Sequence, residues 1–305
     1  MFIVRHRKIF FALSIILIGV SLYGIFKFGF RESIDFKGGS ITEVSYPDGR
    51  PDKALVESHI GGLGFGGFSV RPSENNRYII RTQELTEADR ESLLDTLSSG
   101  GSVKVVVERS NTIGPVAGAE LKSKAYKAIS VVILMIVLFV TFAFRKVSKP
   151  VASWKYGLAA IIALSHDVII PAGVFVFLGH YLGTEIDLLF VTGLLAILGY
   201  SVHDTIVVFD RVRENLKVNH HTNKKEDFEA TVGASVHQTF GRSINTSLTI
   251  FITLLALYLI GGPATKDFAL LLLIGVIVGT YSSIFVASPL LVTFQKLQKS
   301  STKNK

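Results

Sequence analysis

Two ionisable residues of opposite charge lie in or beside apolar stretches of the sequence. Asp204 belongs to the apolar run 186–209, and Arg242 immediately precedes the run 243–260. A charge near the middle of a bilayer costs about 2.5–3.5 kcal/mol on insertion scales, so such residues face a bundle interior or a water path. If the two helices face each other, ionised Asp204 pairs with Arg242 and protonated Asp204 releases it. The pattern therefore predicts a proton relay, with a static buried pair as the alternative.

Further polar side chains in the apolar runs could support a relay or hold neighbouring helices together. These side chains are His166, Asp167, Tyr200, His203, Asn245 and Thr246. Tyr200 and Asp204 are four residues apart and share a helix face, and Arg242 and Asn245 share another. His203 is able to titrate near neutral pH, although a packing role is equally compatible with its position.

Six apolar runs are long enough to cross about 30 Å of hydrocarbon as helices. Helix is the required form, because an open sheet would leave backbone groups unpaired in lipid. The runs cover residues 9–28, 127–144, 155–177, 186–209, 243–260 and 268–294. The first could be a signal peptide, but it is long for one and no small-residue cleavage site follows it. We therefore expect an α-helical polytopic membrane protein with six transmembrane helices.

Lysine and arginine gather in alternate loops, which predicts the orientation of the chain. They occur before the first span, in the second–third and fourth–fifth loops and in the tail, as Arg5, Arg7, Lys8, Arg145, Lys146, Lys149, Lys155, Arg211, Arg213, Lys217, Lys224, Lys225, Lys296, Lys299, Lys303 and Lys305. The two short loops on the other side contain only Lys266. Both termini are therefore expected in the cytoplasm. Nucleic-acid or ribosome binding is the alternative interpretation, and we expect no nucleic-acid partner.

Residues 29–124 separate the first two spans, so we expect them outside the cytoplasm as a small α+β domain. Strand patterns cover residues 41–46, 68–71, 78–82 and 103–108, and helix patterns cover residues 51–60 and 87–97. The order βαββαβ is the ferredoxin-like pattern. The predicted division is residues 1–28 for the N-terminal segment and first helix, 29–124 for the periplasmic domain, 125–295 for a five-helix region and 296–305 for a basic cytoplasmic tail.

Composition and short motifs argue against several kinds of chemistry. The chain has no cysteine, which excludes disulfides, thiolate metal sites and cysteine nucleophiles. Residues 62–67 match G-x-G-x-x-G, but a helix pattern precedes them and a strand pattern follows, the reverse of a dinucleotide site. The sequence contains no Walker motif. We expect no cofactor, no metal and no enzymatic activity.

Five motifs follow one another along the chain. They are S-I-D-F-K-G-G-S at residues 33–40, I-G-P-V-A-G-A-E-L at 113–121, L-S-H-D at 164–167, G-Y-S-V-H-D-T-I-V-V-F-D-R-V-R-E at 199–214 and R-S-I-N-T-S-L-T at 242–249. With the predicted topology, the chain resembles the SecF family, of the SecD/SecF proteins in the resistance-nodulation-division superfamily, over residues 1 to about 295. Ser33 stands where the family usually has glycine, and His203 stands where asparagine is common.

The resemblance implies an auxiliary subunit of the Sec translocase in the bacterial inner membrane, driven by the proton motive force, that promotes preprotein export. The implied partners are SecD, which completes a twelve-helix unit, the SecYEG channel, YajC and the translocating preprotein. The resemblance also implies that Asp204 and Arg242 belong to the proton path. Two alternatives remain open, a non-energised scaffolding or assembly subunit of the translocase and a small-molecule exporter of the same superfamily.

Overall fold

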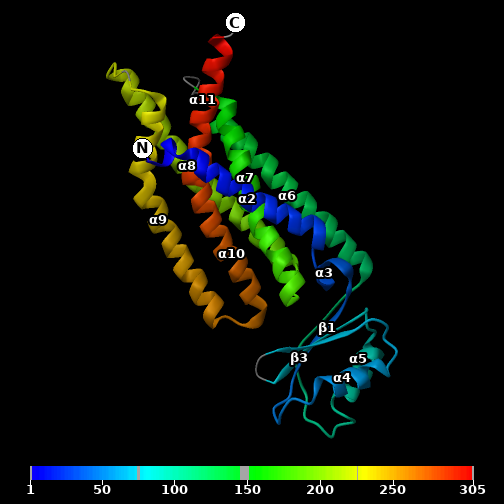
Figure 1. The fold of residues 1–305 in the computed structure, drawn as a ribbon. Helices are drawn as coiled ribbons and strands as arrows, with labels where there is room; N and C mark the ends of the chain where they lie inside the picture. The colour runs from blue at the N-terminus through cyan, green and yellow to red at the C-terminus, as the bar shows by residue number, and fades with distance from the viewer. Residues whose placement is uncertain (1, 74–75, 145–150, 225, 304–305) are drawn as a thin grey trace. The chain divides into compact units, whose positions relative to one another are not determined.

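The computed structural model describes residues 2–73, 76–144, 151–224 and 226–303. It divides into two compact units, a helical unit of residues 1–31 and 127–305 and a smaller unit of residues 32–126 (Figure 1). Five of the predicted cytoplasmic basic residues lie outside the described residues, namely Arg145, Lys146, Lys149, Lys225 and Lys305.

Within the described residues, six helices are long and apolar enough to cross a membrane, as the sequence predicts. A one-turn helix, α1 (Phe2–Arg5), precedes them. The first five spans are α2 (Arg7–Phe28), α6 (Pro115–Ala143), α7 (Ser153–Leu182), α8 (Leu188–His221) and α9 (Phe228–Ile260). The sixth span consists of α10 (Pro263–Ser282), the π-helical segment η1 (Ser283–Ala287) and α11 (Ser288–Lys303), which follow one another without a break.

Several helices extend beyond the apolar runs that predict them. α8 continues to His221 although its apolar run ends at residue 209, and α9 begins at Phe228 although its run begins at residue 243. At the start of α8, the Asp187 side chain accepts a hydrogen bond from the Phe190 N–H at 2.8 Å, which caps the helix. Apolar periodicity marks the membrane-spanning part of each helix, whereas caps and loops decide where the helix ends.

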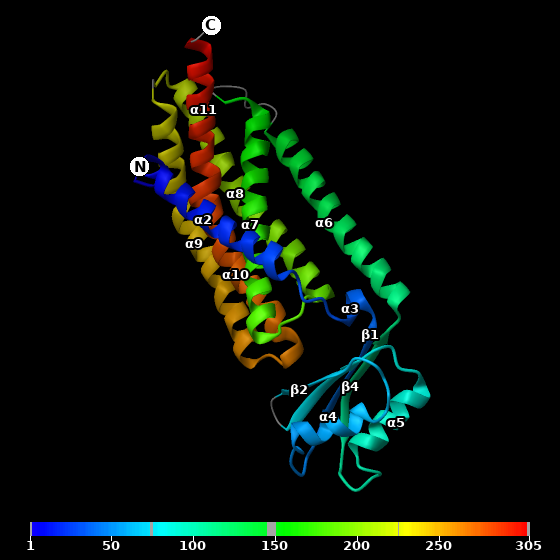
Figure 2. The same ribbon diagram turned by 45° about the vertical axis from the view of Figure 1, so that its right-hand side comes forward.

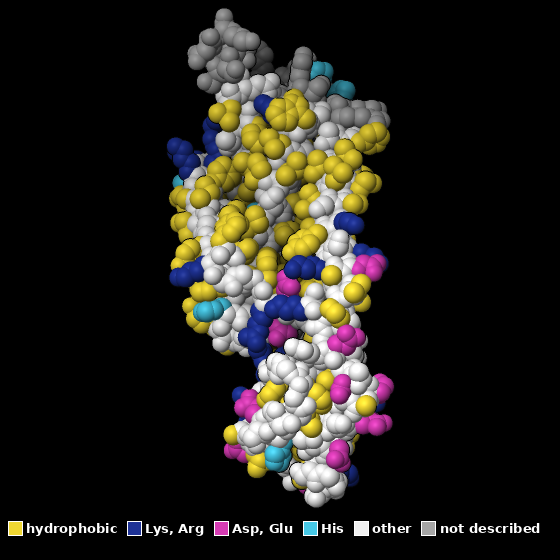
Figure 3. Space-filling view, turned by 90° about the vertical axis from the view of Figure 1, so that its right-hand side faces the viewer, with side chains coloured by type: hydrophobic (Ala, Val, Ile, Leu, Met, Phe, Trp, Pro, Cys, Tyr) yellow, Lys and Arg dark blue, Asp and Glu magenta, His cyan; other side chains and the backbone are white. Residues whose placement is uncertain are grey.

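The helical unit has an inner and an outer set of helices. α7, α8 and the composite sixth span bury much of their surface inside the chain, whereas α2, α6 and α9 leave most of theirs uncovered. Small residues allow close approach within the inner set, because a Cβ at Gly275 of α10 would collide with the Ile197 side chain of α8. In the view of Figure 3 the helical unit presents a largely hydrophobic surface, which suits contact with lipid or with partner helices.

In its described residues the smaller unit contains a four-stranded antiparallel sheet with two helices inserted between the strands in chain order. Its elements in chain order are β1 (Gly39–Ser45), α4 (Lys53–Gly61), β2 (Ser69–Ser73), β3 (Arg77–Thr82), α5 (Glu87–Leu97) and β4 (Val106–Ile113). The strand order is β2-β3-β1-β4, and every neighbouring pair is antiparallel. Val44, Ile60 and Leu93 belong to one buried core formed by the sheet and both helices, and α4 and α5 lie beside the sheet in Figure 2. This is the split-βαβ arrangement, so the predicted ferredoxin-like fold is confirmed.

The last strand differs from its predicted position at residues 103–108. β4 begins at Val106, ends at Ile113 and pairs with the whole of β1. The register shifts between Glu43 and Val44 of β1, which marks a β-bulge. β4 is an edge strand with exposed or half-buried side chains, so its polar residues show no apolar alternation that a pattern search would detect.

A glycine turn in the first sequence motif joins the short helix α3 (Ile34–Lys37) to β1. Gly38 has φ 77°, and a Cβ at this position would lie 2.7 Å from the Pro115 Cα. A Cβ at Gly118 would lie 3.2 Å from the Phe36 carbonyl oxygen. The motif at residues 33–40 therefore packs directly against the motif at residues 113–121, at the start of α6, and only glycine fits this contact at Gly38.

Candidate functional site

The carboxylate of Asp204 lies inside the helical unit, between α8 and α9. Asp204 is 7% exposed, and the Ser243 hydroxyl of α9 donates a hydrogen bond to Oδ1 at 2.6 Å. Its Oδ2 is also buried and has no hydrogen-bond partner among the described residues. A buried polar atom without a partner requires a proton, a water molecule or a mobile group to satisfy it. The position therefore suits exchange of a proton or of a hydrogen-bond partner.

The expected ion pair between Asp204 and Arg242 is not formed in this structure. Within the described residues, Asp204 is bonded to Ser243 instead, and the Arg242 side chain is exposed. Arg242 and Ser243 are successive residues of α9, so their side chains point about 100° apart around the helix. With Ser243 turned toward Asp204, Arg242 is turned away from a direct contact with the carboxylate.

Arg242 lines an open pocket between α8 and α9 with a volume of about 400 Å³. The pocket wall is mixed and includes the polar side chains of Asp210, Arg211 and Gln238 beside apolar side chains of α8. Arg211 donates to the Gln238 side-chain oxygen at 2.6 Å, which ties the two helices together there. Asp204 is not among the described residues that line this pocket.

The second buried carboxylate, Asp167 of α7, has a fuller set of partners than Asp204. Its side chain is 0% exposed, and its Oδ2 accepts hydrogen bonds from Ser201 of α8 and from Ser282 of α10, the latter at 2.7 Å. Nδ1 of His166 lies 2.8 Å from Oδ1 of the same carboxylate. His166 is itself buried, and its Nε2 has no hydrogen-bond partner in the described part of the chain. His166 and Asp167 thus form a dyad that is more deeply buried than Asp204.

A chain of hydroxyl groups joins α8, α9 and α10. Tyr200 of α8 bonds to Ser247 of α9 and lies 3.1 Å from the Thr280 hydroxyl of α10. Ser247 and Thr280 lie 2.6 Å apart, and Ser247 also donates to the Ser243 carbonyl at 2.7 Å. Because each hydroxyl both donates and accepts, one reorientation is passed along the chain. The predicted supporting role of Tyr200 remains a prediction, but the structure gives it partners on two other helices.

The regular α-helical hydrogen bonding is interrupted near Asp167 both in α7, which carries it, and in the neighbouring sixth span. Pro171 of α7 has no N–H, so it cannot donate to the Asp167 carbonyl four residues earlier. The sixth span becomes π-helical immediately after Ser282. Ser283, the first residue of this segment, lies 3.0 Å from the Thr205 hydroxyl of α8. π-helical turns are rare and frequently occur at functional sites, because they realign the side chains of a helix.

Three of the predicted supporting residues lie apart from the hydrogen-bond networks of the two carboxylates. His203, Asn245 and Thr246 are all exposed in this chain. His203 adjoins Asp204 in sequence but projects from another face of α8. Polar side chains on uncovered faces of membrane-spanning helices indicate that another helix covers them, since lipid does not satisfy their hydrogen bonds.

The prediction missed the hydroxyl partners of the two carboxylates. Ser243, Thr280, Ser282 and Ser283 all contribute to these networks, yet small hydroxyl residues are common in membrane helices as simple packing groups. The available signal was the cluster of polar residues 280–283 within the otherwise apolar sixth run.

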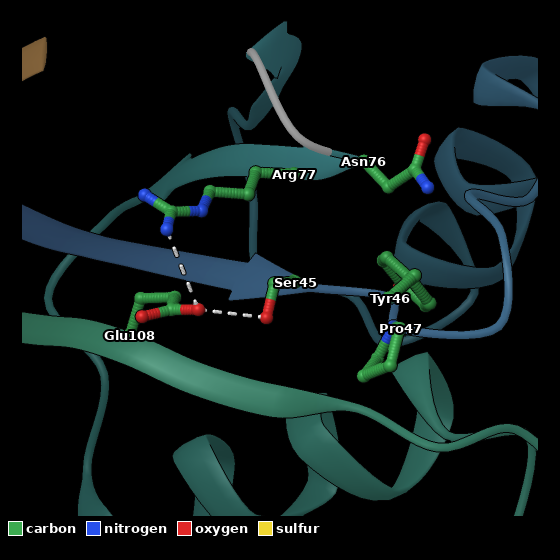
Figure 4. Close-up of a pocket in the computed structure, with 6 residues that line it drawn as sticks. All are labelled: Ser45, Tyr46, Pro47, Asn76, Arg77 and Glu108. Carbon is green, nitrogen blue, oxygen red and sulfur yellow. Dashed lines mark hydrogen bonds and ion pairs between the residues drawn. The ribbon is translucent and has the colours of Figure 1, made fainter.

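A smaller pocket of about 280 Å³ lies on the sheet of the other unit (Figure 4). Arg77 of β3 reaches across β1 to Glu108 of β4 at 3.7 Å, and the Ser45 hydroxyl donates to the same carboxylate at 2.8 Å. Arg77 also pairs with Glu43 of β1 at 3.5 Å. These contacts connect three strands. No cluster of histidine and acidic side chains able to hold a metal occurs in the described ranges of the chain.

The fold and the site together define a class of protein. In the described part of the chain, six membrane-length helices, a ferredoxin-like domain between the first and second of them, and two carboxylates buried among the helices describe a polytopic membrane protein with an ionisable interior.

Comparison with known sequences specifies the family. Residues 94–297 match the family described as protein export membrane protein SecD/SecF, C-terminal. The protein translocase subunit SecF of Thermobaculum terrenum is 41% identical, over 96% of this chain and 93% of its own length. SecF of Anaerolinea thermophila is 38% identical, over 96% and 94%. The chain belongs to the SecF family of protein translocase subunits.

Solved structures agree with this assignment. A crystal structure of SecDF from Thermus thermophilus, a translocon-associated membrane protein, matches with a TM-score of 0.82 at 32% sequence identity. A second SecDF structure, in a super-membrane-facing form, matches with a TM-score of 0.67. The first match covers 96% of this chain but only 38% of the SecDF chain, so the present fold corresponds to one part of that longer protein.

Proposed function

We propose that this chain is a subunit of the Sec translocase of the bacterial inner membrane that uses the proton motive force to promote preprotein export. The observation that carries the proposal is the carboxylate of Asp204, which is buried in a membrane-spanning helix with one oxygen unpaired. Ionisable groups in such positions mark ion and proton paths. The proposed work is mechanical, so it requires no covalent chemistry on the preprotein.

The charge of Asp204 would control how α8 and α9 meet. Ser243 donates to the carboxylate in this structure, and Arg242 precedes it on α9. Rotation of α9 about its axis, together with reorientation of the long Arg242 side chain, would exchange Ser243 for Arg242, which attracts the ionised carboxylate; protonation removes that attraction. One charge that crosses 100 mV is worth about 2.3 kcal/mol, enough to bias a two-state equilibrium roughly fiftyfold.

We propose SecD as the partner that completes a twelve-helix unit, with the SecYEG channel and YajC as further components and the preprotein as cargo. The Thermus thermophilus relative, named protein translocase subunit SecDF, supports SecD, because this chain matches 38% of its length at 33% identity. The exposed polar side chains of Asn245 and Thr246 support a helical partner against α9. The basic residues of alternate loops support an orientation with both termini in the cytoplasm.

Proton flux through the reconstituted complex tests the proposal. We expect Asp204→Asn and Arg242→Met each to abolish proton flux and gradient-dependent stimulation of export, while pull-down still recovers the complex. The matched control is Asp210→Asn, because Asp210 is an exposed aspartate of the same helix, paired with Arg213 at 3.4 Å. If the Asp204→Asn complex shows the proton flux of the parent, the proposal is contradicted and the chain acts as a scaffolding subunit. Variants of a scaffolding subunit would reduce export only where they disrupt assembly of the complex.

A further inference from the structure

We propose that His166 and Asp167 form a second proton-binding site, coupled to Asp204 through Ser282 and Ser283 at the π-helical turn. The inference rests on the proposed function, because it adds a site to the same proton-driven mechanism. The second site differs from the Asp204 site in two ways. It binds a proton on another helix, α7, and it depends on the π-helical part of the sixth span.

The hydrogen bonds of the dyad identify where the proton binds. The Asp167 carboxylate accepts from the Ser201 and Ser282 hydroxyls, and Nδ1–H of His166 completes a set of three donors. In this tautomer Nε2 of His166 is an acceptor, yet it is buried without a partner among the described residues. When a hydronium ion donates its proton to Nε2, one N–H bond forms, one O–H bond of the hydronium breaks and water is left, and the imidazolium lies beside the carboxylate. The dyad then carries no net charge, which suits a site sealed from water.

Among the described residues, the groups that pack around the dyad are uncharged. A proton bound to the dyad is therefore what neutralises the negative charge of Asp167. The Tyr281 ring of α10 stacks on His166 with centroids 5.8 Å apart, and its hydroxyl donates to the Phe10 carbonyl of α2. From α2, Ser14 bonds to the same tyrosine hydroxyl, and from α8 the facing group is Ser201. No lysine or arginine pairs with Asp167 in the part of the chain that is described.

Two adjacent serines connect the dyad to the neighbourhood of Asp204. Ser282 donates to Asp167, and Ser283 contacts Thr205, the residue after Asp204. Each serine has the Gly279 carbonyl as a second acceptor, at 3.0 Å in both cases. The Gly279 carbonyl oxygen has two lone pairs and accepts from both serines, so it joins Ser282 to Ser283. A hydroxyl has one proton, so a Ser282 hydroxyl that leaves Asp167 donates fully to Gly279, which weakens the bond from Ser283 to the same oxygen and frees Ser283 to change its contact with Thr205 of α8.

α8 provides a second connection between the sites. Ser201 bonds to Asp167 on one side of the helix, and Asp204, three residues later, bonds to Ser243 of α9. A shift of α8 therefore changes both sets of hydrogen bonds together. Pro171 makes a shift on the α7 side easier, because the Asp167 carbonyl lacks the donor that a regular helix would supply.

Nitrogen-15 NMR of histidine-labelled full chain in lipid nanodiscs tests the site. The His166 signal is assigned by its loss in His166→Gln. We expect its Nε2 resonance to move between neutral and protonated positions within about pH 4 to about pH 10. A resonance that keeps one position throughout this range in the parent overturns the site.

The same signal tests the coupling. We expect Asp204→Asn to displace the His166 titration midpoint by about one pH unit, equivalent to a tenfold change in proton affinity. Ser283→Ala should remove most of this displacement, and Asp210→Asn should leave the midpoint unchanged. If the His166 titration midpoint is the same in the parent and in Asp204→Asn, the proposed coupling is wrong. If proton flux still depends on Asp204 in that case, only this inference fails; if flux is independent of Asp204, the proposed function fails.

Discussion

Asp167 and Asp204 show how immediate neighbours decide what a buried carboxylate does. Asp167 accepts from two serines and faces the imidazole of His166, so both of its oxygens are occupied. Asp204 accepts a hydrogen bond from Ser243, and Ser283 is near enough to act on it as a further donor, but its Oδ2 makes no hydrogen bond of ordinary geometry within the described residues. The carboxylate with the unpaired oxygen is the one able to exchange partners, which is why Asp204 carries the proposed function.

At the residue scale, Gly38→Ala should destabilise the smaller unit strongly. The substitution places a Cβ at φ 77° and 2.7 Å from the Pro115 Cα, so backbone strain and a clash add to about 2–4 kcal/mol. Gly64→Ala is the matched control, because Gly64 has φ 69° with nothing within 4 Å and should cost only about 1–2 kcal/mol. Hydrogen exchange of the β1 and β3 amides in the full chain measures both. Equal effects would mean that the packing of the two motifs contributes nothing.

At the element scale, the sheet depends on charged side chains as well as on its core. Arg77 of β3 reaches Glu43 of β1 and Glu108 of β4, so one guanidinium connects three strands. Its side chain is 27% exposed, and that of Glu43 is 16% exposed, so water screens these pairs less than it screens a fully exposed pair. Edge strand β4 has few buried apolar side chains, which makes such contacts more important for holding it in register.

We expect Arg77→Met to cost about 0.5–1 kcal/mol, because it leaves two glutamates without their shared cation. The effect should be concentrated in β1, β3 and β4 and be detected as faster hydrogen exchange of their amides. Arg90→Met is the control, since Arg90 pairs only locally with Glu87 at i,i+3 on the surface of α5, and it should change stability by under about 0.5 kcal/mol. Unchanged protection of β4 in Arg77→Met would show that the ion pairs do not hold this strand.

At the scale of the whole molecule, the chain leaves α2, α6 and α9 largely uncovered. On α6, Leu134, Leu138 and Phe142 are exposed apolar side chains that lipid can satisfy. On α9, Arg242 and Asn245 are exposed polar side chains that lipid cannot satisfy. The two faces therefore differ in what they require, and the polar face of α9 is where a partner helix is expected.

The absence of cysteine allows this face to be probed one residue at a time. We expect Asn245→Cys to react with N-ethylmaleimide in the isolated detergent-solubilised chain and about tenfold more slowly in complex with SecD, because a packed interface excludes the reagent. The control Lys217→Cys, on the polar end of α8, should react at the same rate in both. Equal labelling of Asn245→Cys with and without SecD would place the partner elsewhere.

Much of the fold follows from the pattern of the sequence. Six apolar runs predict the six helices, and the βαββαβ order predicts the ferredoxin-like sheet. The two patterns can be told apart because a helix in lipid needs a long continuous apolar run, whereas a strand with one buried face alternates apolar and polar residues. The predicted position of the last strand was wrong, because the side chains of edge strand β4 are exposed or half-buried and show no alternation of apolar and polar residues. Asp204 and Asp167 could be named as buried acids because charges are rare in apolar runs.

The sequence by itself therefore determined which segments enter the membrane and which ionisable residues they carry, since both depend on residue type and local spacing. Only the tertiary structure decided the partners of those residues. It placed Ser243 rather than Arg242 at Asp204, and Ser201 and Ser282 at Asp167. These contacts depend on the rotation of each helix about its axis and on the π-helical turn, both of which are set by the packing of side chains far apart in sequence.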